Sequence, residues 1–272
     1  MTVAVRRGYV DVPHGQVHLR VAGSADAATP PLLCLHMSPA SGLVYEQFMA
    51  HIGESRQVIA MDTPGFGASD PLPAHPEIAD YARVVAQVIE ALGLSAPVDV
   101  MGYHTGSFTA LELSRLRPDL VRRVVAVSLP LFTEEELVDF RALYDTAPIF
   151  TPDGTRLLER WRWFVDFFRV GTVNTVEHAA RIFHARLSGG ERHWWGHRAA
   201  FAYDVVAAAG QVDVPMLVIN PDDDLRQHTP RIMPYLRNAT LFDASDWTHG
   251  FLDTHSSEAA RLVAGFLDAP AP

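Results

Sequence analysis

The stretch Val98-Asp-Val-Met-Gly-Tyr-His104-Thr-Gly-Ser-Phe108 decides the fold of this chain. Its first residues form an apolar run typical of a buried strand, and its last residues begin a helix that we expect over residues 105–116. Gly102 and Gly106 predict a tight turn between the two elements. Such a turn lifts the side chain at its apex above the end of the sheet, and the residue at the apex is His104.

Strands and helices alternate along the chain on both sides of this stretch. Residues 8–21 read as two short strands around Pro13-His14-Gly15, which predicts a hairpin. Further strands are expected over 31–35, 57–61, 124–129, 215–220 and 239–242, and further helices over 78–92 and 256–267. Continuous Val, Leu and Ile runs between helices predict an α/β protein with a mostly parallel, doubly wound sheet that helices cover on both faces.

Residues 132–210 differ in composition from the rest of the chain. They hold four of the five tryptophans, at helical spacing among arginines and histidines: Trp161, Trp163, Trp194 and Trp195. We predict a helical cap over 132–210, inserted between the parts of the α/β core at 1–131 and 211–272. We expect the cap to lie over the carboxyl edge of the sheet, where α/β proteins bind their ligands.

Composition and charge exclude several classes of function. The chain has 272 residues, 48% of them apolar and 20% charged, which is ordinary for a soluble globular protein. A net charge of −10 argues against a nucleic-acid partner, and no segment holds ~18 consecutive apolar residues that could span a membrane. Cys34 is the only cysteine, and the first residues lack a signal-peptide pattern, so we expect a cytoplasmic protein.

All 22 basic residues are arginine, and this removes any chemistry that needs a lysine. A Schiff base, a lysine-anchored pyridoxal phosphate and a P-loop are all excluded. We expect neither a metal nor an organic cofactor. The partner that we expect is a small-molecule substrate, and the protein is expected to be a monomer or a homodimer.

Several motifs appear in an order that resembles the α/β-hydrolase fold superfamily over nearly the whole chain. They are Leu35-His-Met-Ser-Pro39, Asp62-Thr-Pro-Gly-Phe-Gly-Ala-Ser69, the turn at His104, Asn220-Pro-Asp-Asp-Asp224 and Trp247-Thr-His249-Gly-Phe251. In this family the turn after the central strand is a nucleophile elbow of pattern G-x-S-x-G. Here the pattern is G-x-H-x-G, so the resemblance implies the fold but leaves the reaction open.

The resemblance also implies partners for His104. Family members place an acid after a late strand and a histidine after the last strand. Asp224 fits the position of the acid, although Asp222 and Asp223 are adjacent alternatives, and His249 fits the position of the histidine. The backbone N–H groups of Met37 and Thr105 match the oxyanion hole of the family. Ser107 lies a helical turn beyond the apex, so we do not expect it to replace the missing nucleophile.

The chemistry of His104 can be interpreted in two ways. A neutral imidazole could attack an acyl group directly, but an acyl-imidazole would form usefully only from phenolic, enolic or thioester leaving groups. Alternatively, His104 and His249 could share a proton and act in general acid/base catalysis. We therefore expect hydrolysis of a small apolar or aromatic ester, thioester, lactone or activated carbonyl compound. The alternative function is that of a cofactor-free lyase or oxygenase that uses the histidine pair. The third candidate function is that of a ligand-binding pseudo-hydrolase.

The aromatic residues of the cap favour an apolar or aromatic substrate. The side chains that we consider for the pocket are His36, Tyr103, Trp161, Phe164, Phe168 and Trp195. Trp161, Phe164 and Phe168 share one helical face, however, and such a face more often packs a cap onto its core. His36 is expected mainly to bond the backbone of its loop. Three arginines could receive a substrate carboxylate, although solvated helix faces usually explain such charges: Arg160, Arg162 and Arg169.

Overall fold

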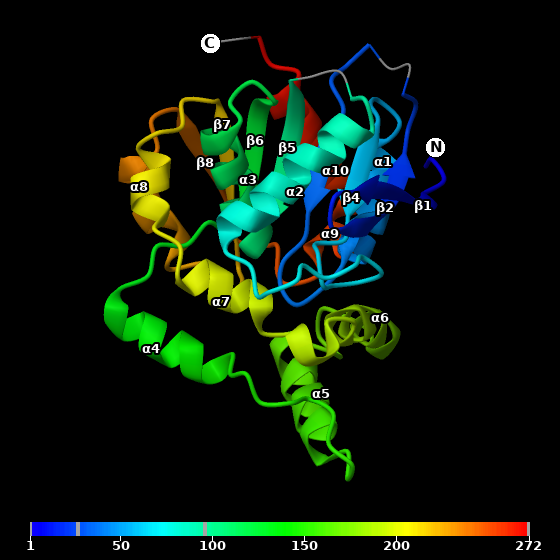
Figure 1. Cartoon of the computed structure of the whole chain (residues 1–272), viewed down its shortest axis with the longest axis vertical. Coiled ribbons are helices and arrows are strands. Elements are labelled where there is room, and N and C mark those ends of the chain that lie inside the picture. The colour runs from blue at the N-terminus through cyan, green and yellow to red at the C-terminus, as the bar shows by residue number, and fades with distance from the viewer. Residues whose placement is uncertain (1, 26–27, 95–96, 271–272) are drawn as a thin grey trace.

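A mostly parallel β-sheet forms the centre of the protein (Figure 1). The computed structural model describes residues 2–25, 28–94 and 97–270. Within these residues the sheet has eight strands in the order β1-β2-β4-β3-β5-β6-β7-β8. Their bounds are β1 Arg6–Val12, β2 Gly15–Ala22, β3 Leu32–Leu35, β4 Val58–Met61, β5 Val98–Tyr103, β6 Val121–Val127, β7 Met216–Pro221 and β8 Ala239–Ala244. Strands β3 to β8 run parallel, while β1 and β2 form the predicted antiparallel hairpin, so the expected fold class is confirmed.

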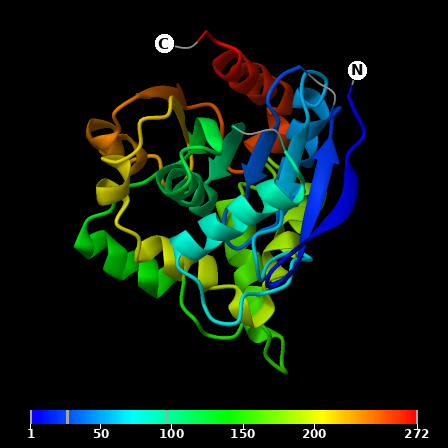
Figure 2. The same cartoon turned by 45° about the horizontal axis from the view of Figure 1, so that its top comes forward.

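Helices cover both faces of this sheet because successive strand residues point to opposite sides. On β5, Val100 packs in the hydrophobic cluster beneath α2 (Ile78–Ala91) and α3 (Thr105–Leu116). Its neighbour Met101 packs in the opposite cluster, beneath α1 (Glu46–Ile52) and α10 (Ser256–Leu267). Figures 1 and 2 show α2 and α10 on opposite sides of the strands. Both strand faces are therefore buried, as the continuous apolar runs predict.

The helices between β6 and β7 form most of the region predicted as a cap. They are α4 (Glu134–Leu143), α5 (Thr155–Phe167), α6 (Val176–Leu187), α7 (Trp195–Phe201) and α8 (Val205–Ala209), and Figure 1 shows α4, α5 and α6 extending away from the sheet. Helix α8 instead packs against α3 within the cluster of the core. The boundary at residue 210 stays a prediction, but this packing places the last predicted cap helix on the core.

The remaining elements are short. They comprise α9 (Phe251–Thr254) and three separate 3₁₀ helices, η1 (Gly42–Tyr45), η2 (Gly190–Arg192) and η3 (Thr229–Tyr235). Among the described residues, no helix combines the length and the apolar character needed to cross a bilayer.

Strand β6 begins three residues earlier than the apolar run predicts, because arginines form its start. We expected a strand over 124–129, and the structure has Val121–Val127. The Arg122 guanidinium donates to both carboxylate oxygens of Asp99, at 2.9 and 2.6 Å. Arg123 donates to the backbone carbonyl of Ala269 at 2.6 Å, beyond the end of α10. Charged side chains can therefore occupy this strand because each finds a partner on a neighbouring element.

A buried ion cluster ties this end of the sheet to α10. Arg56 is only 1% exposed and donates to Asp268 at 2.7 Å and to Asp99 at 3.4 Å. Asp99 is fully buried and also accepts from Arg122. Removing one partner of such a buried pair leaves the other charge uncompensated, which costs more than the pair itself contributes.

We predict that Asp99→Asn lowers the free energy of unfolding by about 3 kcal/mol and Tm by roughly 6–12 °C, because Arg56 and Arg122 lose their carboxylate. Thermal and urea denaturation measure the change. Asp213→Asn is the matched control, since Asp213 pairs with Arg237 at 3.1 Å with both side chains more than half exposed. That change should cost less than about 1 kcal/mol. Equal effects of the two substitutions would contradict the role given to burial.

Candidate active site

His104 stands between β5 and α3 in a backbone conformation that few side chains adopt. Its φ of 49° and ψ of −111° lie outside the common regions, and such a residue costs about 1–3 kcal/mol unless its surroundings hold it in place. The flanking glycines explain how the turn is held. A Cβ on Gly102 would lie 2.2 Å from the carbonyl oxygen of Gly106, and a Cβ on Gly106 would lie 2.0 Å from that of Leu35. The turn is thus pressed against the end of β3.

We predict that Gly106→Ala lowers stability by about 1–3 kcal/mol and displaces His104, because the added methyl group has to push apart α3 and the end of β3. Denaturation and a crystal structure of the variant test both effects. Gly265→Ala is the control, since its Cβ would meet nothing within 4 Å on helix α10. A Gly106→Ala protein as stable as the Gly265→Ala protein would show that the close approach is not required.

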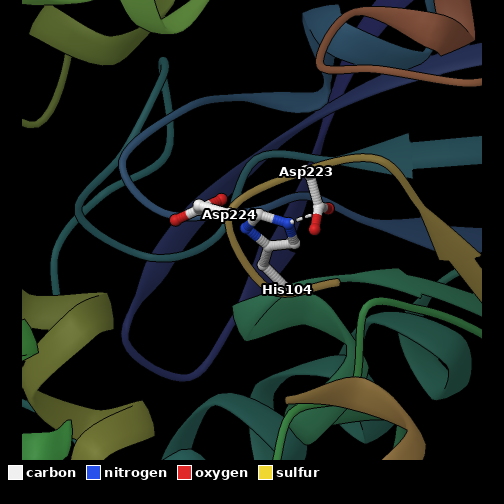
Figure 3. Close-up of side chains that lie close together, drawn as sticks. All are labelled: His104, Asp223 and Asp224. Carbon is white, nitrogen blue, oxygen red and sulfur yellow. Dashed lines mark hydrogen bonds and ion pairs between the residues drawn. The ribbon is translucent and has the colours of Figure 1, made fainter. Parts of the chain in front are cut away.

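A buried aspartate holds the imidazole of His104. Asp223 Oδ2 lies 2.8 Å from His104 Nε2, and the Asp223 side chain is completely buried (Figure 3). The same carboxylate accepts from the Ser128 hydroxyl at 2.6 Å and from the backbone N–H of Leu225 at 2.9 Å. Three donors therefore fix the orientation of the Asp223 carboxylate directly beside the ring.

The next residue in the chain holds the second histidine. Asp224 Oδ1 lies 3.0 Å from His249 Nε2, and Asp224 Oδ2 accepts from the Tyr144 hydroxyl at 3.3 Å. The rings of His104 and His249 lie 5.8 Å apart at 78°. The structure therefore brings His104, Asp224 and His249 together as the sequence predicts. Asp222, the third candidate for the acid, is directed elsewhere and accepts from Arg169 at 3.0 Å.

The two histidines use the same ring nitrogen for their carboxylates. In a neutral imidazole the nitrogen bonded to a carboxylate carries the proton, so we assign Nε2–H to both rings and a free lone pair to both Nδ1 atoms. His249 Nδ1 is buried and has no hydrogen-bond partner among the described residues. Each ring in its neutral form therefore offers an unprotonated Nδ1 as a base or nucleophile.

In this cluster the neighbouring charges and burial shift the pKa values of His104 and Asp224 in opposite directions. Burial alone would lower the pKa of His104, but the carboxylates of Asp223 and then Asp224 outweigh it, and the pKa is raised above its ordinary value. Burial alone would raise the pKa of Asp224, but the hydrogen bond and charge of His249 outweigh it, and the pKa is lowered. Near neutral pH, His104 consequently binds a proton more readily than a free imidazole does.

We predict a pH dependence that follows from this shift. A reaction that needs neutral His104 should rise with pH through a midpoint above the ordinary value of about 6.5. Asp223→Asn removes the charge that favours the imidazolium, so the midpoint should move down. Asp222→Asn is the control on the neighbouring residue and should leave the midpoint in place. The profile of kcat/KM against pH measures both, and an upward shift in Asp223→Asn would contradict the assignment.

The backbone groups expected to form an oxyanion hole lie close to this turn. Gly106 touches the carbonyls of Leu35 and His36, so the loop that carries Met37 lies against the start of α3. Within the described parts of the chain, neither the Met37 N–H nor the Thr105 N–H donates to an acceptor. Ser38, a residue that sequence reasoning missed, adds a buried hydroxyl that has no hydrogen-bond partner in the described parts of the chain. These donors are available to a developing oxyanion.

Two small adjoining cavities lie beneath the cap. One, of about 30 Å³, is lined by His104 and Asp224 together with Tyr144 and His197. The other, of about 40 Å³, shares Tyr144 and His197 and extends into the cap. Tyr144 and His197 stack with their ring centroids 3.8 Å apart and line both cavities, so this pair lies where the two cavities meet. Nothing in the local sequence around either residue marks this position, because it depends on how α4 and α7 pack.

The side chains predicted for the pocket do not line these cavities, so that part of the interpretation is corrected. Tyr103, Phe164 and Phe168 are at most 2% exposed and pack in one hydrophobic cluster, where Phe164 on α5 contacts Phe183 on α6. Trp161 packs on Phe183, and Trp195 packs against Gly65. His36 bonds loop backbone, with Nδ1 2.6 Å from the Met37 carbonyl and Nε2 accepting from Thr63 at 2.8 Å.

The three arginines that we considered as binding groups for a substrate carboxylate are either paired with an aspartate or exposed. Arg160 donates to Asp145 at 3.3 Å, and Arg169 donates to Asp222. Arg162 is exposed on α5. None of the three lies free beside His104. Arg186 lines the cavity next to that of His104 and has no carboxylate partner among the described residues, and the sequence did not single it out.

One group of side chains has the spacing of metal ligands. A donor atom from each of His104, Asp223 and Asp224 lies within 4.8 Å of the others. Figure 3 shows the imidazole between the two carboxylates. Asp223 and Asp224 are already engaged by His104 and His249, so the arrangement is that of two histidine–aspartate pairs.

Comparisons with known proteins agree with this architecture. A sequence profile described as the alpha/beta hydrolase fold matches residues 30–147, a range that contains β3, the turn at His104 and α4. The enol-lactonase from Burkholderia xenovorans LB400 superposes with a TM-score of 0.79 at 18% identity, covering 96% of this chain and 100% of that one. The chain therefore has the α/β-hydrolase fold.

Curated relatives of this α/β-hydrolase-fold protein include enzymes of more than one kind. The 2-(acetamidomethylene)succinate hydrolase of Mesorhizobium japonicum is 29% identical over 130 residues, which are 48% of this chain and 45% of that enzyme. The match thus spans less than half the length of that relative. The non-heme chloroperoxidase of Streptomyces lividans is 26% identical over 77% of this chain and 80% of its own.

Proposed function

We propose that this protein hydrolyses a small ester, thioester, lactone or activated carbonyl compound that is apolar or aromatic. The observation that carries the proposal is the 2.8 Å bond between His104 and buried Asp223 at the apex of the elbow. A carboxylate that orients an imidazole and strengthens it as a base is a recurring device of general-base catalysis. The enol-lactonase fold neighbour and the succinate hydrolase relative support a hydrolytic reaction.

In the proposed reaction His104 activates a water molecule. Nδ1 of His104 takes a proton from the water, and the water oxygen attacks the acyl carbon. The N–H groups of Met37 and Thr105 stabilise the oxyanion that forms. The bond to the leaving group then breaks, and the leaving oxygen or sulfur receives that proton from the His104 imidazolium, either directly or after the proton has passed to Nδ1 of His249. The products are a carboxylic acid and an alcohol, an enol or a thiol.

Direct attack by His104 on the acyl carbon is the second route to the same products. It would form an acyl-imidazole, which water must then cleave. Both routes favour leaving groups that depart readily. His104 stands where a serine alkoxide would attack in the family, and an imidazole leaves a tetrahedral intermediate more easily than an alkoxide does. Phenyl esters, enol esters and thioesters are therefore the proposed substrates, and simple alkyl esters are not.

The paired histidines also support a second candidate function. Two imidazoles with free Nδ1 atoms, 5.8 Å apart at the rings, can abstract and return a proton without any hydrolysis. A cofactor-free lyase or oxygenase would use them in this way. The chloroperoxidase relative is consistent with a non-hydrolytic use of the scaffold.

We predict that the wild-type protein turns over phenyl acetate and a thioester but not ethyl acetate, and that His104→Ala lowers kcat for the phenyl ester by about 10²–10⁴-fold. His184→Ala, at an exposed histidine on α6, is the control and should retain activity. Steady-state assays with acid release measure the effect. Mass spectrometry after rapid quenching separates the two routes, since only direct attack leaves an acetyl group on His104. A wild-type protein inert toward all three esters, together with an esterase gained by His104→Ser, would overturn hydrolysis and favour proton transfer.

A further inference from the structure

Arg186 carries a charge that the described structure does not neutralise. It lies in the last turn of α6, partly buried, with its guanidinium carbon 5.3–6.0 Å from the ring centres of Trp163, Phe164 and Phe167. Among the described residues it has neither a hydrogen-bond acceptor nor an ion-pair partner for this group. Four other arginines share that property within the described chain, and all four are exposed: Arg6, Arg162, Arg192 and Arg198. Among the described arginines without a partner, Arg186 is therefore the one that is partly buried.

An unpaired charge in an apolar setting is costly. Buried charges in proteins are normally paired, because the desolvation of an isolated ion costs several kcal/mol. Aromatic faces offset part of this cost, about 0.5–2 kcal/mol for each well-placed ring. They leave the five N–H donors of the guanidinium without acceptors. The Arg186 guanidinium is therefore suited to bind an anion that comes from outside the chain.

No nearby carboxylate is free to play this part. Asp145 lines the same cavity, but it accepts two hydrogen bonds from Arg156, at 2.6 and 2.7 Å, and one from Arg160. Asp224 is engaged by His249 and Tyr144. Burial and the charge of Arg186 hold the pKa of His197 well below its ordinary value, so this ring stays neutral and does not compete for an anion.

The position of Arg186 relates it to the catalytic end of the site. The cap cavity is lined by Arg186 with the rings of Trp163 and Phe183, and it adjoins the His104 cavity across Tyr144 and His197. A small planar molecule could therefore present an anionic group to Arg186 and an acyl group to His104. The aromatic walls between them would contact its apolar body.

We propose that Arg186 binds a carboxylate of the substrate, so that the molecule acted on is an aromatic or unsaturated acyl compound bearing a free carboxylate. The part of this inference that concerns turnover rests on the proposed function, whereas the binding of the carboxylate does not. The planar fork of a guanidinium matches both oxygens of a carboxylate. A single negative charge balances the single unpaired cation, while a doubly charged phosphate would leave excess negative charge near Asp224 and Asp145.

A paired set of substrates tests the turnover part. Meta- and para-acetoxybenzoate are compared with the matching acetoxybenzamides, which keep the phenolic ester and remove the charge. We expect wild type to favour the acids by about tenfold or more in kcat/KM, and Arg186→Met to reduce this ratio by about tenfold or more, chiefly through KM. Arg186→Lys keeps the charge but not the fork, so its ratio should fall between the two.

Arg198→Met is the matched control for the loss of an arginine from an aromatic face. Arg198 lies over Trp194 at 5.5 Å without an ion pair among the described residues, but it is exposed and lines neither cavity. Its acid-to-amide ratio should equal that of wild type. The melting temperature of every variant is recorded, so that a loss of the cap fold in Arg186→Met is recognised and Arg186→Lys then decides the comparison.

A binding experiment keeps the two proposals separate. Calorimetry measures phenylacetate and phenylacetamide on the His104→Ala protein with and without Arg186→Met, and inorganic phosphate serves as a second anion. Tighter binding of phenylacetate that depends on Arg186 supports the inference even if no ester is hydrolysed, in which case only the hydrolytic function fails. Ester turnover with no preference for the acids, and no preference for phenylacetate over its amide, overturns the inference and leaves the function standing. Binding of phosphate in preference to phenylacetate also overturns it.

Discussion

The close contact between the turn at His104 and the end of β3 is the constraint on which the site depends. Gly106 lies directly against the Leu35 carbonyl, and Gly102 lies directly against Gly106, so the backbone between them has a single available path. That path forces His104 to a positive φ and directs its ring above the carboxyl edge of the sheet. The same contact brings the loop of Met37 beside the N–H of Thr105. The positions of His104 and of the backbone N–H groups of Met37 and Thr105 therefore follow from one steric arrangement.

Electrostatic balance determines what the turn can do. Asp223 and Asp224 are consecutive in the chain, yet each engages a different histidine, His104 or His249. An imidazolium formed on either ring therefore has a carboxylate directly beside it to balance its charge. His104 and Asp223 are thus parts of one hydrogen-bonded arrangement at the end of the central strand.

Much of the fold could be predicted from local patterns, and particular elements show why. The helix expected over 105–116 is observed as Thr105–Leu116, because a buried strand, two glycines and an apolar helix leave little freedom. The start of β6 was predicted too late, since the charges of Arg122 and Arg123 are acceptable there only through Asp99 and the end of α10. The pocket residues were assigned wrongly, because helical spacing identifies an apolar face of α5 without saying what that face meets.

The sequence by itself determined the parallel sheet, the hairpin, the elbow and the identity of the residue at its apex, because each depends on neighbours within a few positions along the chain. It also limited the candidates for the acid that pairs with a histidine to three consecutive aspartates, residues 222–224. Only the tertiary structure decided that Asp223 holds His104 while Asp224 holds His249 and Asp222 turns away, since adjacent side chains point in different directions. It alone decided that Arg186, on α6, has no ion-pair partner among the residues that the structure describes. A missing partner is a property of the whole packed chain and has no local signal.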